Sequence, residues 1–202
     1  MSQHSLKILI AVKTCNAHAD KANLQRKLWA QCVKDADVKF FLGRGATRDQ
    51  LSDEVFLNCG DGYDDLTDKA RAVFYWACER GYDYIFYVDD DVYVRVERLL
   101  ASDFADYDYV GRLSTISGIY ASGGPGIWLS RRALEILVRE PVTDTVDDRW
   151  VGNTLAKNGI RLHHDVRYCV SRNWERYKDS FISCCSEREV PINLALLHKA
   201  NV

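Results

Sequence analysis

The sequence lacks long hydrophobic runs and any large excess of charge of one sign. No apolar stretch among its 202 residues approaches the roughly 18 residues of a membrane-spanning helix. The apolar stretch Leu6–Val12 is too short and wrongly flanked for a signal peptide. Because 27 Lys and Arg face 29 Asp and Glu, the net charge is only −2. We therefore expect a soluble protein with no transmembrane segment in this chain and no nucleic-acid partner.

Proline is also scarce, with three residues, and the chain shows no internal repeat, linker or low-complexity segment. A length of 202 residues with 47% hydrophobic content suits one domain with a proper core. We therefore expect a single domain over residues 1–202. A domain cut from a larger protein fits the same pattern.

Cysteine pairs with metal-site or redox spacing are absent. The seven cysteines are an odd number, and no two of them form a CxxC pair. Neither a disulfide framework nor a structural zinc site is therefore predicted. Reduced thiols in a cytoplasmic compartment are the expectation. Cys32 and Cys78 lie on apolar faces of predicted helices, so we expect both to be small core residues.

Hydrophobic patterning predicts alternating strands and helices. Strands are expected at residues 6–12, 38–42, 55–57, 84–88, 108–113 and 127–129, and helices at residues 20–35, 66–80, 96–100, 131–140 and 147–158. Ser130 is the expected cap of the fourth helix, and Gly81 and Gly159 are expected stops. This order predicts an α/β sandwich with a mostly parallel sheet. Such sheets bind ligands at the carboxyl ends of their strands.

Three consecutive carboxylates, Asp89, Asp90 and Asp91, follow the apolar run Tyr84–Val88. Unpaired buried charge is costly, so the strand should end where the acids begin. In an extended chain residues i and i+2 point the same way, so Asp89 and Asp91 should face one side and Asp90 the other. Two carboxylates at a strand end suit a hard cation such as Mn²⁺ or Mg²⁺. A solvated acidic turn is the alternative.

Four further candidates for ligand binding precede these acids. Val12, Lys13 and Thr14 end the first strand, so they should reach the same sheet edge. The alternative for Lys13 is an exposed cation. Lys69 lies in the first turn of a helix, where the helix dipole disfavours a cation. That position favours a role near nucleotide or phosphate, and a solvated surface lysine is the alternative.

The second half of the chain adds a glycine-rich turn and an acidic pair. Gly123 and Gly124 let the backbone approach a ligand closely, or they form a tight turn. Trp128 can offer a face to a sugar, but a core aromatic is the favoured interpretation. Asp147 and Asp148 open an apolar helix, where one carboxylate can cap the helix and the other can act as a general base.

Five blocks in this order resemble the Fringe and β-1,3-galactosyltransferase-like glycosyltransferases of the GT-A type. They are ILIAVKT (8–14), DDLTDKARAVFYWACE (64–79), YVDDDVYV (87–94), SGGPGIWLSRRAL (122–134) and VDDRWVGNTLAKNGI (146–160). The resemblance implies a Rossmann-like three-layer α/β/α sandwich with a mostly parallel mixed sheet. It also implies an inverting, Mn²⁺- or Mg²⁺-dependent transfer of a hexose from a UDP-sugar donor to an acceptor hydroxyl of a glycan or glycoconjugate.

The resemblance also assigns roles to the acidic residues. Asp91 is the expected direct metal ligand, and Asp89 is expected to bind the metal through water or to hold the ribose. Asp90 is expected to support them from the opposite side. Similarity to the family's acidic motif makes Asp148 the expected general base, with Asp147 as the second choice.

The C-terminal part departs from the family. Family members usually supply a histidine ligand there, whereas the corresponding segment Phe181–Cys185 carries cysteines. His198 is the candidate ligand, with His163, His164, a water or a diphosphate oxygen as alternatives. The missing histidine supports a second hypothesis, a nucleotide-sugar-binding module without transfer activity. A metal-dependent nucleotidyltransferase would need a basic triphosphate-binding loop, which the sequence does not show.

Overall fold

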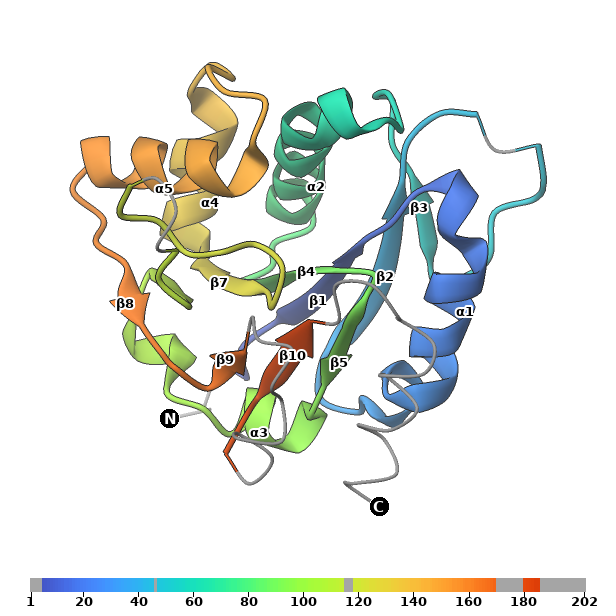
Figure 1. Cartoon of the computed structure of the whole chain (residues 1–202), viewed down its shortest axis with the longest axis horizontal. Helices are drawn as coiled ribbons and strands as arrows, with labels where there is room; N and C mark the ends of the chain where they lie inside the picture. Colours follow the sequence, from blue (N-terminus) through green and yellow to red (C-terminus); the bar gives the residue numbers. More distant parts are fainter. Residues whose placement is uncertain (1–4, 46, 115–117, 170–179, 186–202) are drawn as a thin grey trace.

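The computed structural model describes residues 5–45, 47–114, 118–169 and 180–185. Within these residues a seven-stranded main sheet has the order β3-β2-β1-β4-β7-β6-β8, and a three-stranded sheet has the order β5-β10-β9 (Figure 1). The strands of the main sheet are β1 (Ile8–Lys13), β2 (Asp37–Leu42), β3 (Glu54–Phe56), β4 (Tyr84–Asp89), β6 (Tyr109–Gly111), β7 (Ile127–Ser130) and β8 (His163–His164). Those of the small sheet are β5 (Val92–Val94), β9 (Tyr168–Cys169) and β10 (Ser183–Cys185). The α-helices are α1 (Ala19–Leu28), α2 (Leu66–Glu79), α3 (Val96–Leu100), α4 (Arg131–Arg139) and α5 (Asp147–Lys157).

The main sheet is mostly parallel, as the alternation of elements predicts. Strands β1, β2, β3 and β4 run parallel, and β7 is antiparallel to both of its neighbours, β4 and β6. Strand β8 returns parallel to β6. The pairing of β1 with β4 sets Lys13 directly beside Asp89. The carboxyl ends of two central strands therefore meet at one edge with an opposite charge on each.

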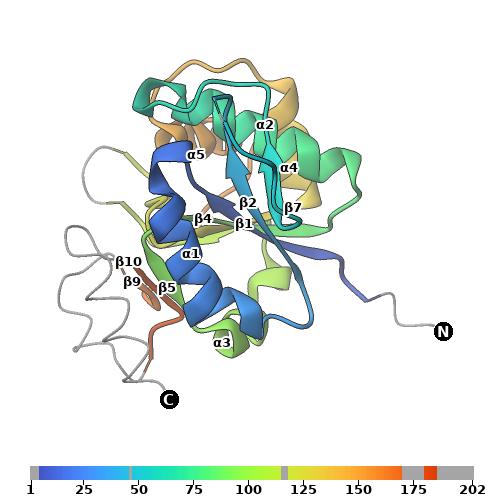
Figure 2. The same cartoon turned by 90° about the vertical axis from the view of Figure 1, so that its right-hand side faces the viewer.

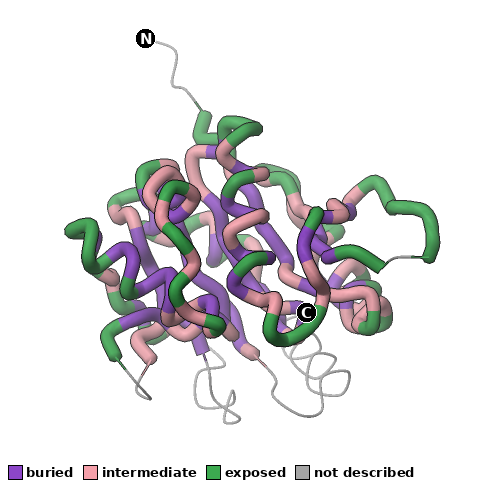
Figure 3. The backbone as a smooth tube through the Cα atoms, turned by 90° about the horizontal axis from the view of Figure 1, so that it is seen from above, coloured by how far each residue is buried: buried purple, intermediate pink, exposed green. Residues whose placement is uncertain are grey.

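The sheet separates two apolar layers. Along β1, Leu9 and Ala11 pack into one hydrophobic core, and Ile10 and Val12 pack into the other. Helices α2, α4 and α5 cover the first face, and α1, α3 and the small sheet lie on the second (Figure 2). The buried backbone runs through the middle of the molecule (Figure 3). The expected three-layer sandwich is confirmed, with the small sheet sharing the second outer layer.

Several predicted boundaries are confirmed by local geometry. Ser130 caps α4 by accepting a hydrogen bond from the Ala133 amide at 3.2 Å. Gly81 and Gly159 follow α2 and α5 with φ of 69° and 78°, the left-handed conformation in which glycine ends helices. The prediction of a single domain over residues 1–202 stays a prediction.

The predicted helix over residues 20–35 is wrong in its second half. Helix α1 ends at Leu28, because Trp29 leaves helical geometry with φ −143° and buries its ring in the core. Its indole Nε1 donates to the Val92 carbonyl at 3.2 Å, and a 3-10 turn follows at Ala30–Cys32. The thiol of Cys32 is consequently exposed, so its core assignment is also wrong, whereas Cys78 packs half-buried against the core.

The predicted strand over residues 108–113 is shorter in the structure. Strand β6 ends at Gly111, which packs tightly under Ala121, since a Cβ at residue 111 would lie 2.8 Å from the Ala121 Cβ. Beyond it only the bridge between Leu113 and Ala121 continues.

No helix of the described residues is long and apolar enough to cross a membrane.

Candidate active site

A cavity of about 470 Å³ lies at the carboxyl ends of β1 and β4. It gathers residues that the sequence singles out separately, namely Lys13, Thr14, Lys69, Asp89, Asp90 and Asp91. His18, Lys21, Asp61 and Tyr63 also line it. A larger hollow of about 720 Å³ runs along α2 and beside β3, and it includes none of the candidate site residues. The side chain of Val12 is fully buried in the core beneath the site.

The three consecutive aspartates have different partners. Strand β4 ends at Asp89, and Asp90 and Asp91 form a turn, so the alternation predicted for an extended chain stays a prediction. Asp89 Oδ1 lies 2.8 Å from Lys13 Nζ. Asp90 is 5% exposed, and its Oδ2 accepts from the Thr14 hydroxyl and contacts His18 Nδ1, both at 2.8 Å. Asp90 thereby fixes the loop after β1 and the start of α1.

Asp91 differs from its two neighbours because it has no ion pair with any described residue. Burial, followed by the charges of Asp89 and Asp90, raises the pKa of Asp91 to about 6. A cation that approaches a buried carboxyl group near other negative charges stabilises its ionised form.

Lys13 joins the aspartate turn to helix α5. Its Nζ lies 2.7 Å from Asp147 Oδ2, close to the Asp89 contact described above. Burial by itself lowers the pKa of Lys13, but the nearby charges, Asp89 foremost, outweigh burial and hold the pKa well above its ordinary value. Tyr87, whose pKa burial raises well above its ordinary value, donates its hydroxyl to the same Asp147 oxygen at 3.3 Å. Lys13 and Tyr87 therefore hold the Asp147 carboxyl group in place.

Asp148 is placed differently from Asp147. Its Oδ2 accepts from the Gly123 amide at 3.0 Å, and its buried Oδ1 has no hydrogen-bond partner among the described residues. Burial raises the pKa of Asp148. The N-cap of α5 is Val146, with no side-chain cap, so the capping interpretation is wrong for both aspartates. The two carboxyl groups differ in their contacts, because Asp147 is ion-paired and Asp148 Oδ1 has no described partner. The general-base role of Asp148 stays a prediction.

The glycine-rich turn connects Asp148 to the end of the described chain. A Cβ at Gly123 would lie 3.2 Å from the Asp148 Cβ, and one at Gly124 would lie 3.5 Å from Cys185 Sγ. The Ser183 hydroxyl donates to the Pro125 carbonyl. Strand β10 thus supports the turn that holds Asp148.

Lys69 is buried at 1% exposure, so the solvated surface alternative is wrong. Its Nζ donates to the Thr14 carbonyl at 2.9 Å and to Asp61 Oδ1 at 2.6 Å. Asp61 also accepts from the Asn16 and Gly43 amides at 2.6 and 2.7 Å. Lys69 and Asp61 therefore lock together the loops that follow β1 and β2. Asp61 is not singled out by the sequence analysis, and its only signal in the sequence is its place in the Gly- and Asp-rich stretch 60–65.

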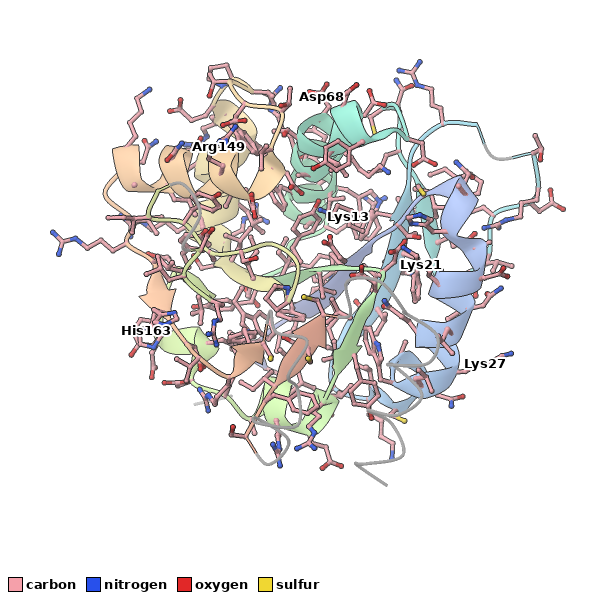
Figure 4. The ribbon with its side chains drawn as sticks, viewed as in Figure 1. Lys13, Lys21, Lys27, Asp68, Arg149 and His163 are labelled. Carbon is pink, nitrogen blue, oxygen red and sulfur yellow. The ribbon has the colours of Figure 1, made fainter. Side chains whose placement is uncertain are left out.

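The remaining candidates lie elsewhere. His163 stacks on Tyr107 at 3.6 Å between ring centroids and lies well away from Lys13 (Figure 4). His164 Nδ1 accepts from the Leu113 amide at 3.0 Å. His198 lies outside the described residues. Trp128 is a core aromatic, fully buried and stacked on Phe104, as favoured above. No group of three or more His, Cys, Asp or Glu within the described ranges is arranged to hold a metal ion.

Comparison with known proteins supports the same class of activity. Residues 32–107 match a family model described as galactosyltransferase. No curated protein sequence matches the chain. The resemblance to galactosyltransferases is thus confirmed in part, and a closer kinship with Fringe stays a prediction.

Solved structures share the fold. A glycosyltransferase involved in glycosylation of the major capsid of PBCV-1 aligns with TM-score 0.60 and 12% identity over 96% of this chain and 98% of that one. The galactosyltransferase LgtC, solved with donor and acceptor sugar analogues, aligns with TM-score 0.56 and 13% identity over 95% of both chains. GlyE of Streptococcus pneumoniae TIGR4 aligns with TM-score 0.59 and 10% identity over 98% of this chain and 60% of that one. Together, the family match and these GT-A neighbours support a glycosyltransferase.

Proposed function

We propose that the protein is a metal-dependent, inverting glycosyltransferase that moves a hexose from a UDP-sugar to a hydroxyl of a glycan or glycoconjugate. One observation carries the proposal. Asp91, a carboxylate with no ion pair among the described residues, lines the cavity together with Lys13 and Asp89. Lys13 in turn bridges to Asp147, the neighbour of Asp148, whose Oδ1 has no described hydrogen-bond partner. Metal-assisted donor activation and proton acceptance each use a carboxylate, and the site supplies two carboxylates with different contacts.

Asp91 and Asp89 are the residues that would hold Mn²⁺ or Mg²⁺. The absence of a three-residue cluster from the described part fits these ions, because Mg²⁺ in particular is usually held by one or two carboxylates together with water and substrate phosphate oxygens. When bound, the ion supplies Lewis-acid stabilisation of the leaving diphosphate. His198 remains a candidate for a further ligand.

The donor nucleotide is expected in the cavity beside β1. Lys21 is 30% exposed there and adds positive charge near the three aspartates, which suits a diphosphate. The hydroxyl of Thr14 is held by Asp90, so its loop is fixed before ligand arrives. Tyr63, 80% exposed at the cavity, offers an aromatic face to a base or sugar. Lys69 acts on the nucleotide through the Thr14 loop.

Asp148 accepts the proton in this reaction. The acceptor oxygen forms a bond to the anomeric carbon while the bond from that carbon to the diphosphate breaks. The acceptor proton passes to Asp148 Oδ1, the oxygen without a described partner. Attack opposite the leaving group inverts the anomeric centre. Asp147 is the second choice for this part, because Lys13 and Tyr87 both occupy its Oδ2.

A screen of UDP-, GDP- and dTDP-sugars with and without Mn²⁺ tests the proposal. We expect a UDP-sugar with Mn²⁺ to raise the midpoint of thermal unfolding, and UDP release to depend on an acceptor. Asp91→Asn should remove the Mn²⁺-dependent part of UDP affinity, whereas Asn at the exposed Asp49 should leave it unchanged. Unaltered Mn²⁺-dependent affinity in the Asp91 variant would contradict the assignment.

The binding-module alternative predicts a different result. The segment Phe181–Cys185 carries cysteines where the resembling family has a histidine, which is the observation that favours it. A module of this kind would be stabilised by a UDP-sugar but would show neither transfer nor hydrolysis to UDP. Turnover with any donor excludes it.

A further inference from the structure

Lys13 is an internal cation shared by two acids from distant parts of the chain. Its side chain is 10% exposed, and its Nζ lies 2.8 Å from Asp89 Oδ1 and 2.7 Å from Asp147 Oδ2. Figure 4 shows it in the middle of the molecule, between the sheet and the helices above. Its ammonium also lies 5.4 Å from the centroid of the Tyr87 ring. One protein charge therefore joins the end of β4 to the start of α5.

The contact between Lys13 and Asp89 makes Asp89 different from Asp91. Both belong to the acidic turn, yet Asp89 already has a cationic partner and Asp91 has none in the described structure. An arriving divalent ion therefore finds Asp91 free and Asp89 occupied. Two cations a few ångströms apart repel each other strongly in a buried site, so a metal ion and Lys13 cannot both hold Asp89 without cost.

We propose that Lys13 is a positioning residue that competes with the divalent cation for Asp89 and so limits the metal affinity of the protein. This inference rests on the proposed function, because it takes Asp91 and Asp89 as the metal-binding acids. Lys13 keeps Asp147 as an alternative partner when the metal takes Asp89. Because the two cations compete for one carboxylate, whatever weakens the hold of Lys13 on Asp89 strengthens metal binding by up to the same factor.

Calorimetric titration with Mn²⁺ alone, without nucleotide, measures this competition directly. Lys13→Met should tighten Mn²⁺ binding at least about fivefold, the lower end of typical coupling between two sites. Lys13→Arg keeps the positive charge and should restore affinity close to that of the unaltered protein. Unchanged or weaker Mn²⁺ binding in Lys13→Met overturns the proposal.

A second comparison separates competition for Asp89 from a general change of charge. On an Asp89→Asn background, Lys13→Met should have less than about a twofold effect, because the contested oxygen is gone. Lys21→Met is the matched control, since Lys21 lies 3.7 Å from Asp90 rather than at Asp89. Its effect should be the same with and without Asp89→Asn. An undiminished Lys13→Met effect on the Asp89→Asn background overturns the proposal.

Removing Lys13 takes the ion-pair partner away from Asp89 and Asp147, so folding of Lys13→Met is checked first by circular dichroism. If it does not fold, Asp147→Asn provides a second route, because Asp89 is then the one remaining ion-pair partner of Lys13 among the described residues. Mn²⁺ binding should weaken in that variant, and the weakening should disappear when Asp89→Asn is also present. Its persistence overturns the proposal. If neither the unaltered protein nor any variant binds Mn²⁺, both this inference and the proposed metal dependence are overturned. If the protein transfers sugar but the Mn²⁺ affinity of Lys13→Met is unchanged, this inference alone is overturned.

Discussion

Asp148 and Asp147 stand one position apart, but their contacts differ in kind. Asp148 Oδ2 accepts from the Gly123 amide, and an asparagine can still accept there. Asp148→Asn should therefore keep the fold and hold the dissociation constant for UDP within a few-fold. Since a general base typically contributes ~10²–10⁴ in rate, kcat should fall at least about a hundredfold.

Steady-state kinetics and melting temperatures of Asp147→Asn and Asp148→Asn together decide the assignment. If turnover collapses in the Asp147 variant and stays near normal in the Asp148 variant, Asp147 is the general base. Normal turnover in both would exclude the mechanism.

Glu54 offers a residue-scale test that is independent of the site. It is 2% exposed on β3 and is held by Arg48 at 2.7 Å and by Arg26 at 2.9 Å. Burial alone raises its pKa, but the Arg48 and Arg26 hydrogen bonds, with the Leu51 amide, lower it to about 2. The stabilisation is present above the unfolded-state pKa of about 4.3 and is lost as the pH falls towards 2.

Glu54→Gln should accordingly lower the free energy of unfolding at pH 7 by on the order of 2 kcal/mol. The difference from the unaltered protein should shrink between pH 4.5 and 2. Urea unfolding across this range measures it. A difference that stays constant with pH would show that the charge of Glu54 contributes nothing.

At the scale of an element, the turn before β7 demands one particular glycine. Gly126 has φ 93°, and a Cβ there would lie 2.3 Å from the Phe86 ring. Gly126→Ala should destabilise the protein by about 2–4 kcal/mol through strain and overpacking. Gly124→Ala is the matched control, because its Cβ would meet Cys185 at an ordinary 3.5 Å. Equal unfolding free energies for the two variants would contradict this account.

Elements with a strong periodic pattern could be predicted from the sequence, and elements set by long-range pairing could not. The apolar residues of helix α2 and strand β4 form patterns that predict both elements from the sequence. The two-residue and three-residue strands β9 and β10 have no periodic signal, and their pairing alone defines them. Cys32 is exposed, rather than in the core as predicted, for a related reason. The hydrogen bond from Trp29 to Val92 overrides local helix propensity and ends the helix early.

The candidate site was predictable in its position more than in its contacts. Strand ends of a parallel sheet meet at one edge, which brought Lys13 and the three aspartates together. The bridge from Lys13 to Asp147 spans 134 residues, and no local pattern specifies it. Neither the burial of Lys69 nor the four-donor environment of Asp61 has a signature in composition.

For the whole molecule, ligand binding should appear as stability. At a free concentration a hundredfold above the dissociation constant, a ligand that binds only the folded state adds about 2.7 kcal/mol. For a chain of about 200 residues this corresponds to a rise of roughly 5–10 °C in melting temperature. A UDP-sugar with Mn²⁺ should give such a rise, and Asp91→Asn should lose its Mn²⁺-dependent part. An equal rise without any divalent ion would remove the metal from the proposal.

The pairing of β10 with β5 also has a consequence for synthesis. Strand β5 begins at Val92, one residue after Asp91, and its partner Ser183–Cys185 lies about ninety residues later. A nascent chain that has emerged only to residue 165 possesses every strand of the main sheet and still lacks this pairing. Contacts so distant along the chain form late. We therefore expect the acidic turn to stay protease-sensitive on the ribosome until β10 emerges, which limited proteolysis of stalled chains of increasing length can measure.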